Sequence, residues 1–263
     1  MNKINILFLM LLLSPGLLYS QNEKPLTLNA GFGLLYHTTD NNFISPLIYR
    51  GTGPAFRFGA DFRLNRLLLN SESVFSSIDL ESNKSSHLDT VLHEDITIMS
   101  QNGCYLKVFD KSYGSLFIGL LGDIHLEIYK LSSSPNAVND LEYEFFQLGA
   151  APAIKYEFQI MNHTISTGFY FPVINYIVRR QWYIYEGMIE NEYYEPLEVL
   201  ANCGEIAYAN EYLKIPLKIK YKYSFNEKFG ISAEYGYTYI SYETPRNIRS
   251  EYQSIIANIE VTL

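Results

Sequence analysis

Apolar and polar residues alternate one by one over much of this chain. Between Leu26 and Tyr36, for example, every second residue is apolar, and most residues between them are small or polar. The pattern returns in ten segments: 26–37, 54–65, 67–80, 93–109, 115–130, 142–158, 163–178, 208–223, 228–242 and 251–263. Because successive side chains of a β-strand point to opposite faces of the sheet, it predicts ten strands, each with one apolar face.

The lengths of these segments and of their connections indicate a membrane barrel. Most segments exceed the roughly 9–11 residues with which a tilted strand crosses the hydrocarbon of a bilayer. Long connections (38–53, 81–92, 131–141, 179–207 and 243–250) alternate with short ones (around Arg66, 110–114, 159–162 and 224–227). Long loops on one side, tight turns on the other and an even strand count are typical of outer-membrane proteins. We therefore predict an all-β fold, an antiparallel up-and-down transmembrane β-barrel of about ten strands.

Two features favour lipid, rather than a soluble core, as the surroundings of the apolar face. Seven glycines lie on the polar face, which suits a narrow lumen, and Gly122 is an exception (Gly31, Gly33, Gly59, Gly119, Gly149, Gly230 and Gly236). Aromatic residues gather near the strand ends, as in the two interfacial girdles of membrane barrels. We expect Phe56, Phe58, Ile118 and Ile219 to face lipid and Arg57, Asp61, Asp123 and Lys218 to face the lumen. A soluble barrel with an apolar interior remains the alternative.

The N-terminal segment has the pattern of a secretion signal. Lys3 precedes an apolar run from Ile6 to Leu13, and Pro15 and Gly16 come before a possible cleavage site after Ser20. The expected organisation is a signal peptide at 1–20 and an outer-membrane barrel at 21–263. The net charge of −8 argues against nucleic acid as a partner, and the two cysteines are too few for a disulfide scaffold or a cysteine-based zinc site.

The sequence YLKIPLKIKYKYSFNEKFGISAEYGYTYI, residues 212–240, resembles the PorT-like outer-membrane β-barrel proteins of Bacteroidota. The last strand, IIANIEVTL, is also similar, although many outer-membrane proteins end in Phe where this chain has Leu263. The resemblance is strong over about the last fifty residues and elsewhere extends only to composition. It implies an outer-membrane location and a barrel fold. It implies no single activity, because the family has none in common.

Two groups of residues on the polar strand faces are candidate chemical sites. Asp123, His125 and Glu127 share one strand face, but neighbours two residues apart are separated by roughly 6.5–7 Å, so we expect no direct bonds between them. We interpret the row as polar filling of the lumen, with a hydrolase as a less favoured alternative. The lysines 214, 218, 220 and 222 form a basic stripe, which we expect to pair with lumenal acids. A turn centred near Asn226 sets Lys218 opposite Glu234. An anion-selective pore wall is the alternative.

The most promising binding site is a long acidic loop rich in aromatic residues. Its candidate residues are Trp182, Tyr183, Tyr185, Glu186, Glu190, Glu192, Tyr193 and Tyr194. Binding residues often lie on loops held by a rigid scaffold. We therefore expect a non-enzymatic outer-membrane barrel that contacts lipid and acts either through its loops or with an envelope protein partner in an envelope assembly. A narrow channel for small solutes is the alternative; no catalytic residue, metal or cofactor is expected.

Overall fold

The described chain forms β-strands joined in one sheet. The structure is a computed structural model that describes residues 26–41, 48–82, 92–111, 114–132, 141–183, 204–243 and 247–263. The strands are β1 (Leu26–Asn41), β2 (Ile48–Leu64), β3 (Leu67–Ser82), β4 (Leu92–Lys111), β5 (Gly114–Ser132), β6 (Leu141–Ile160), β7 (His163–Tyr170), β8 (Ile174–Tyr183), β9 (Gly204–Tyr208), β10 (Tyr212–Ser224), β11 (Phe229–Tyr242) and β12 (Ile248–Thr262). The described residues contain no helix with the length and hydropathy that a membrane crossing requires.

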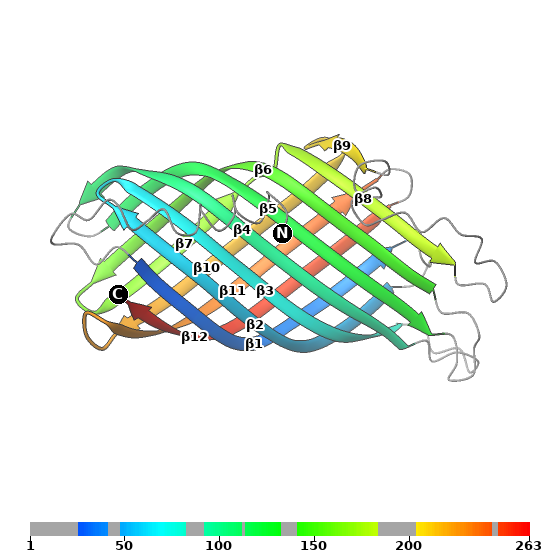
Figure 1. Ribbon diagram of the computed structural model, residues 1–263, viewed down its shortest axis with the longest axis horizontal. Helices are drawn as coiled ribbons and strands as arrows, with labels where there is room; N and C mark the ends of the chain where they lie inside the picture. The colour runs from blue at the N-terminus through cyan, green and yellow to red at the C-terminus, as the bar shows by residue number, and fades with distance from the viewer. Residues whose placement is uncertain are drawn as a thin grey trace, which may run out of the picture.

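The sheet closes on itself as an antiparallel barrel. Its strand order is β5-β4-β3-β2-β1-β12-β11-β10-β7-β6-β8-β9, and an additional pairing of β5 with β6 completes the ring. Figure 1 shows the long strands running obliquely around the barrel wall. β7 and β8 both pair with β6 and occupy one position in the ring, while β9 and β10 occupy the next. The barrel therefore has ten strand positions, which confirms the predicted fold class.

Two of the ten predicted strands are broken. The segment 163–178 is interrupted after Tyr170 and resumes at Ile174, and the segment 208–223 contains a turn at 209–211. Proline in a sheet is confined to edges, strand starts and bulges because it has no amide hydrogen to donate. Pro172 lies in the first break, so the sequence gives a reason for it.

The short connections that the structure describes are tight turns, as predicted. Asn65 and Arg66 join β2 to β3, and Asn65 has a φ of 50°, in the left-handed region that asparagine tolerates. Between β10 and β11, the Asn226 side chain accepts hydrogen bonds from the backbone amides of Lys228 (2.8 Å) and Phe229 (2.9 Å). Such asparagine-capped turns stabilise the chain reversal.

The two faces of the wall have the predicted polarity. Phe56, Phe58, Ile118 and Ile219 are each between 45% and 55% exposed on the outside. Arg57 and Asp123 are buried inside. This arrangement is the reverse of a soluble barrel, in which apolar side chains fill the interior. The exposed apolar side chains extend over every long strand, so a broad apolar belt surrounds a lumen that contains charged and polar side chains as well as an aromatic and aliphatic layer.

Candidate functional site

The acidic loop predicted as a binding site can be placed only in part. Trp182 and Tyr183 belong to the end of β8, where their backbones pair with Glu142 and Leu141 of β6. The other candidates lie outside the described residues (Tyr185, Glu186, Glu190, Glu192, Tyr193 and Tyr194). Cys203 also lies outside the described residues.

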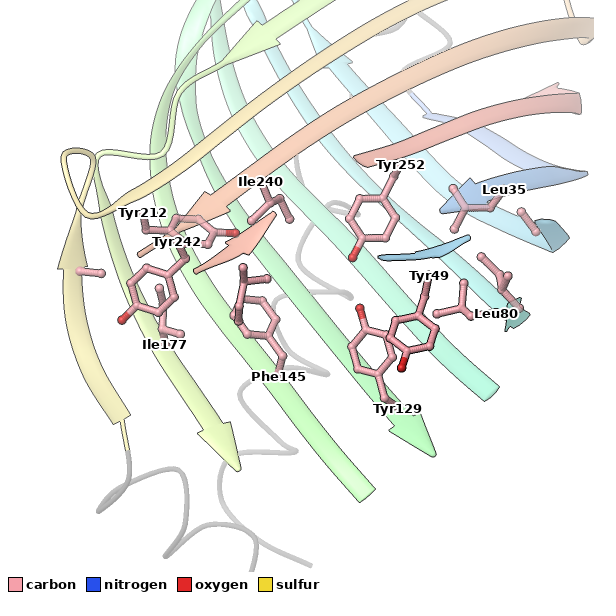
Figure 2. Packing of buried hydrophobic residues seen from close by; sticks show 14 of the residues in the cluster. Leu35, Tyr49, Leu80, Tyr129, Phe145, Ile177, Tyr212, Ile240, Tyr242 and Tyr252 are labelled. Carbon is pink, nitrogen blue, oxygen red and sulfur yellow. The ribbon is translucent and has the colours of Figure 1, made fainter. Parts of the chain in front are cut away.

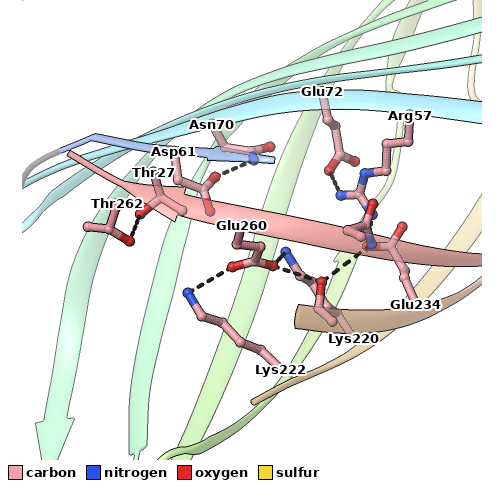
Figure 3. Close-up of polar contacts among 12 residues, drawn as sticks. Thr27, Arg57, Asp61, Asn70, Glu72, Lys220, Lys222, Glu234, Glu260 and Thr262 are labelled. Atoms are coloured by element: carbon pink, nitrogen blue, oxygen red, sulfur yellow. Dashed lines mark hydrogen bonds and ion pairs between the residues drawn. The ribbon is translucent and has the colours of Figure 1, made fainter. Parts of the chain in front are cut away.

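The lumen contains a network of ion pairs that reach across the barrel. Arg57 of β2 bonds to Glu72 of β3 at 2.5 Å and also pairs with Glu234 of β11. Lys218 of β10 pairs with Glu72, on the opposite side of the ring. Figure 3 shows Arg57 between the two glutamates, with the Glu260 cluster beside them. β2 and β3 are neighbours, but the pairs Arg57–Glu234 and Lys218–Glu72 join strands that are not, so these two pairs tie distant parts of the wall together through the lumen.

Further ion pairs fill the turn-side part of the lumen. Glu260 accepts contacts from Lys220 at 2.5 Å and from Lys222 at 2.7 Å (Figure 3). Arg63 of β2 bonds to both carboxylate oxygens of Glu157 on β6, at 2.7 and 2.8 Å. Such two-pronged arginine–carboxylate contacts are geometrically specific. Glu260 and Glu157 are therefore each compensated by a basic side chain.

All four lysines of the basic stripe are paired with acids, as expected. The expected register is wrong, however: Lys218 lies opposite Gly236, and Lys220 lies opposite Glu234. The last pair, Ser224 with Gly230, encloses five residues and centres the turn on Glu227, one residue later than the expected Asn226, which shifts the partner number by two. Lys218 still comes within 4.0 Å of Glu234 because long side chains reach diagonal neighbours.

Asp123 is the centre of a buried polar cluster. Lys214 Nζ lies 2.6 Å from one of its oxygens, and the Tyr170 hydroxyl donates to the other at 2.9 Å. Lys214 is 1% exposed and Asp123 is fully buried. Gln147 also accepts from Lys214 at 3.4 Å and donates to Asn175 at 2.9 Å. The interpretation of Asp123 as polar filling of the lumen agrees with this set of partners.

Two buried histidines lie nearer the loop side, each beside a carboxylate. His37 Nδ1 bonds to Asp95 at 2.7 Å, and His125 Nε2 lies 2.9 Å from Glu127. The side chains of His125 and Glu127 thus come closer than the backbone spacing suggests, although the contact does not have the geometry of a hydrogen bond. The ring of Tyr252 lies between the histidines, stacked on His37 at 4.2 Å and edge-on to His125 at 5.3 Å.

The pairing of His37 with His125 through Tyr252 was missed at the sequence level. The three residues lie on different strands, and the spacing along the chain contains no signal for their contact. Both imidazoles are fully buried. Among the residues that the structure describes, no group of histidine, cysteine and acidic side chains has an arrangement that could hold a metal ion.

An aromatic and aliphatic layer surrounds the histidines. Tyr49, Tyr129, Phe145, Tyr212 and Tyr252 project into the interior from five different strands (Figure 2). Tyr129 donates to Glu127 at 2.7 Å, which ties this layer to the histidine cluster. These side chains occupy the loop-side part of the lumen. The loop-side part of the lumen is therefore rich in aromatic rings, while the ion pairs of Glu260 and Glu157 lie in its turn-side part.

A cavity of about 120 Å³ lies in the lumen between these groups. Its apolar lining includes Leu35, Val74, Met99 and Leu121. Its charged lining consists of four basic and three acidic side chains (Arg57, Lys155, Lys218, Lys220, Asp61, Glu72 and Glu234). The cavity thus has both an apolar and a charged part, as a binding site for an amphipathic molecule needs.

Comparison with known proteins relates the fold to outer-membrane barrels. No family model and no curated protein matches the sequence. The outer-membrane protease OmpT from Escherichia coli has a similar structure, with a TM-score of 0.61 and 7% identity over 94% of this chain and 99% of that one. The translocator domain of the autotransporter NalP from Neisseria meningitidis matches with a TM-score of 0.45 and 9% identity over 99% and 95%. At 7% identity the OmpT match shows a shared fold and says nothing about activity.

Proposed function

We propose that this chain is an outer-membrane β-barrel with a closed lumen, which acts through its extracellular loops or as part of an envelope assembly. The apolar belt on the outside supports the membrane location, because an exposed apolar surface of this extent is unfavourable in water. The resemblance of residues 212–240 to PorT-like proteins is consistent with the same location.

One observation carries the proposal of a closed lumen: ion pairs join strands that are not neighbours in the ring. Arg57 reaches Glu234, Lys218 reaches Glu72, and Lys214 reaches Asp123. Ten strands enclose little space once side chains fill the interior. The lumenal cavity lies between these ion pairs and the aromatic layer, and Arg57, Lys218 and Glu234 line it. A narrow solute channel is therefore the weaker alternative.

The buried positions of the histidines also support a non-enzymatic role. A general base must come within hydrogen-bonding reach of its substrate. His37, His125, Asp95 and Asp123 are fully buried in the lumen, and each lies within ion-pair distance of another protein side chain. They are better suited to holding strands together than to attacking a substrate.

Conductance in planar bilayers tests the closed lumen. The purified protein and its Lys218→Ala variant should both show little anion conductance, because other pairs still cross the lumen in the variant. Arg50→Ala, at an exposed position on the loop side of β2, is the matched control. A large anion-selective conductance of the wild type that Lys218→Ala abolishes would refute the proposal and favour the channel.

Fractionation and loop replacement test the other two parts. Membranes separated by density should contain the protein in the outer-membrane fraction; its recovery in a soluble fraction would contradict the location. Replacing residues 184–200 by a short Gly-Ser linker should leave the barrel folded, as judged by heat-dependent migration in gels. Cross-linking in intact cells should then lose a defined adduct that the wild type forms. An unchanged adduct pattern would argue against a role of this loop.

A further inference from the structure

The barrel wall has a seam between β7/β8 and β9/β10. The ladder between β7 and β10 ends at the pair Phe169–Leu217, and pairing with the next strand position resumes only at Ile174–Tyr208. Four residues, 170–173, therefore face eight residues, 209–216, without ladder pairing between them. On the other sides of the seam, β10 stays paired with β11, and β6 stays bonded to Phe171 and Val173. The interruption is thus confined to one contact between strands.

The sequence accounts for this seam with two prolines. Pro172 and Pro216 lie on its two sides, and neither has an amide hydrogen with which to form a ladder bond. A backbone with unpaired polar groups is costly in hydrocarbon unless it is buried or lines a cavity. The interruption is tolerated here because residues of the seam line the lumenal cavity.

The lumenal cavity reaches the wall at the seam. Its lining includes Phe169, Tyr170, Pro216 and Leu217, which lie where the β7–β10 ladder ends and the interruption begins. Phe169 and Leu217 are also exposed on the outside of the barrel, at 45% and 41%. The same short stretch of wall therefore contacts both the cavity and the surroundings. Val173 and Ile215 extend the apolar outer surface along the seam.

The charged part of the cavity begins directly beside the seam, at Gly168. This glycine faces the lumen, and a Cβ built on it would meet only one atom within 4 Å, the carbonyl oxygen of Ile154 at 4.0 Å. Its neighbours across the ladder are Lys155 on β6 and Lys218 on β10. Lys155 contacts Glu157 at 3.1 Å. Because a lysine ammonium has three donors, it can also hold an oxygen of a ligand.

We propose that the seam and the cavity together form a binding site for a single-chain amphiphile with an anionic head, such as a fatty acid. The head lies at Gly168 between Lys155 and Lys218, and the chain leaves the cavity just beyond the Phe169–Leu217 pair, where residues 170–173 and 209–216 have no ladder pairing, into the surrounding lipid. An apolar cavity of about 150 Å³ holds a benzene ring, so about 120 Å³ accommodates the head and the first few carbons. The site rests on the proposed membrane location and does not require a conducting lumen.

Binding of dansyl-labelled undecanoate to the full-length protein in phosphatidylcholine vesicles tests this site. The wild type should bind the probe saturably. Gly168→Leu fills the cavity beside the lysines and should weaken binding at least about tenfold. Gly122→Leu is the matched control, because Gly122 lies on the outer face, where a Cβ would meet only Asn102 O at 3.8 Å. Equal binding by wild type and Gly168→Leu would overturn the proposal.

Competition and photolabelling keep the test decisive if a variant folds poorly. Decanoate should displace the probe at concentrations about tenfold lower than decanol, because contacts with a charged head are stronger than contacts with a neutral one. Equal competition would overturn the assignment of the head group. A photoreactive decanoate should label wild-type peptides that contain residues 163–173 or 212–218, and uniform labelling of the outer belt would contradict the site. A conductance measured in the same vesicles would refute only the closed lumen.

Discussion

The buried pair of Lys214 and Asp123 provides a quantitative test of how the lumen is held together. The atoms lie 2.6 Å apart, so an effective dielectric constant of about 20 gives an attraction of about 6 kcal/mol. Removing each ion from water costs several kcal/mol, which cancels much of that attraction. Lys214→Met deletes one charge and leaves Asp123 buried without its cation. We expect the free energy of unfolding to fall by about 3–5 kcal/mol.

A double-mutant cycle separates this effect from lost packing. Adding Asp123→Asn to Lys214→Met should recover most of the loss, because no buried charge then remains unpaired. Urea unfolding in lipid vesicles, followed by far-UV circular dichroism, measures the free energy of unfolding of the wild type, the two single variants and the double variant. The control is Lys107→Met, which breaks the exposed pair with Asp110 near the turn and should produce no measurable change. If Lys214→Met and Lys107→Met behave alike, the lumenal pairs do not hold the barrel together.

Two further predictions concern the outer face. Ile118→Arg should destabilise the barrel by about 2–4 kcal/mol in lipid. The control Glu94→Arg, at an exposed position near the loop end of β4, should have little effect. Equal unfolding curves for the two variants would contradict the lipid-facing assignment of Ile118. In a Cys203→Ser background, Cys104 is exposed on the outer face and should react in vesicles with a lipid-soluble maleimide but not with a charged one. Rapid labelling by the charged reagent would place this surface in water.

The strands and their faces could be predicted because alternation is a local property of the sequence. Every expected outward and inward position named for β2, β5 and β10 has the predicted orientation. A register, in contrast, depends on the geometry of a turn, and a turn centred on Glu227 instead of Asn226 moved the partner of Lys218 to Gly236. The sequence therefore determines the side of the wall more reliably than the partner across a ladder.

The lumenal network could not be predicted from the sequence because its partners lie across the ring. His37 contacts Asp95 across 58 positions, and Lys214 contacts Asp123 across 91. Which residues meet depends on the strand order, on the height of each residue along a tilted strand and on the length of its side chain. Alternation specifies none of these three quantities. The seam is an intermediate case, since Pro172 and Pro216 were visible in the sequence but their proximity was not.

Glycines on the inward face provide the last prediction, because the barrel brings neighbouring backbones close to that face. A Cβ on Gly119 would collide with the carbonyl oxygen of Cys104 on the adjacent strand. Backbone atoms cannot move aside as a flexible side chain can, so Gly119→Ala should cost about 1–3 kcal/mol. In the same strand, Gly122 faces outward and has ordinary space for a methyl group. Gly122→Ala should be neutral, or stabilising by about 0.4–1 kcal/mol through the unfolded chain.

Comparing these two alanine variants separates curvature from composition. If glycine were placed in β5 only for general flexibility, both substitutions would change the unfolding free energy alike. If the inward position is demanded by close strand approach, only Gly119→Ala should be destabilising, and Gly119→Ser should be destabilising as well, because it has the same Cβ. Urea unfolding in vesicles of wild type and the three variants decides between these cases. Equal stability of Gly119→Ala and Gly122→Ala would show that the wall accommodates an inward Cβ and that crowding does not explain the glycines of the polar face.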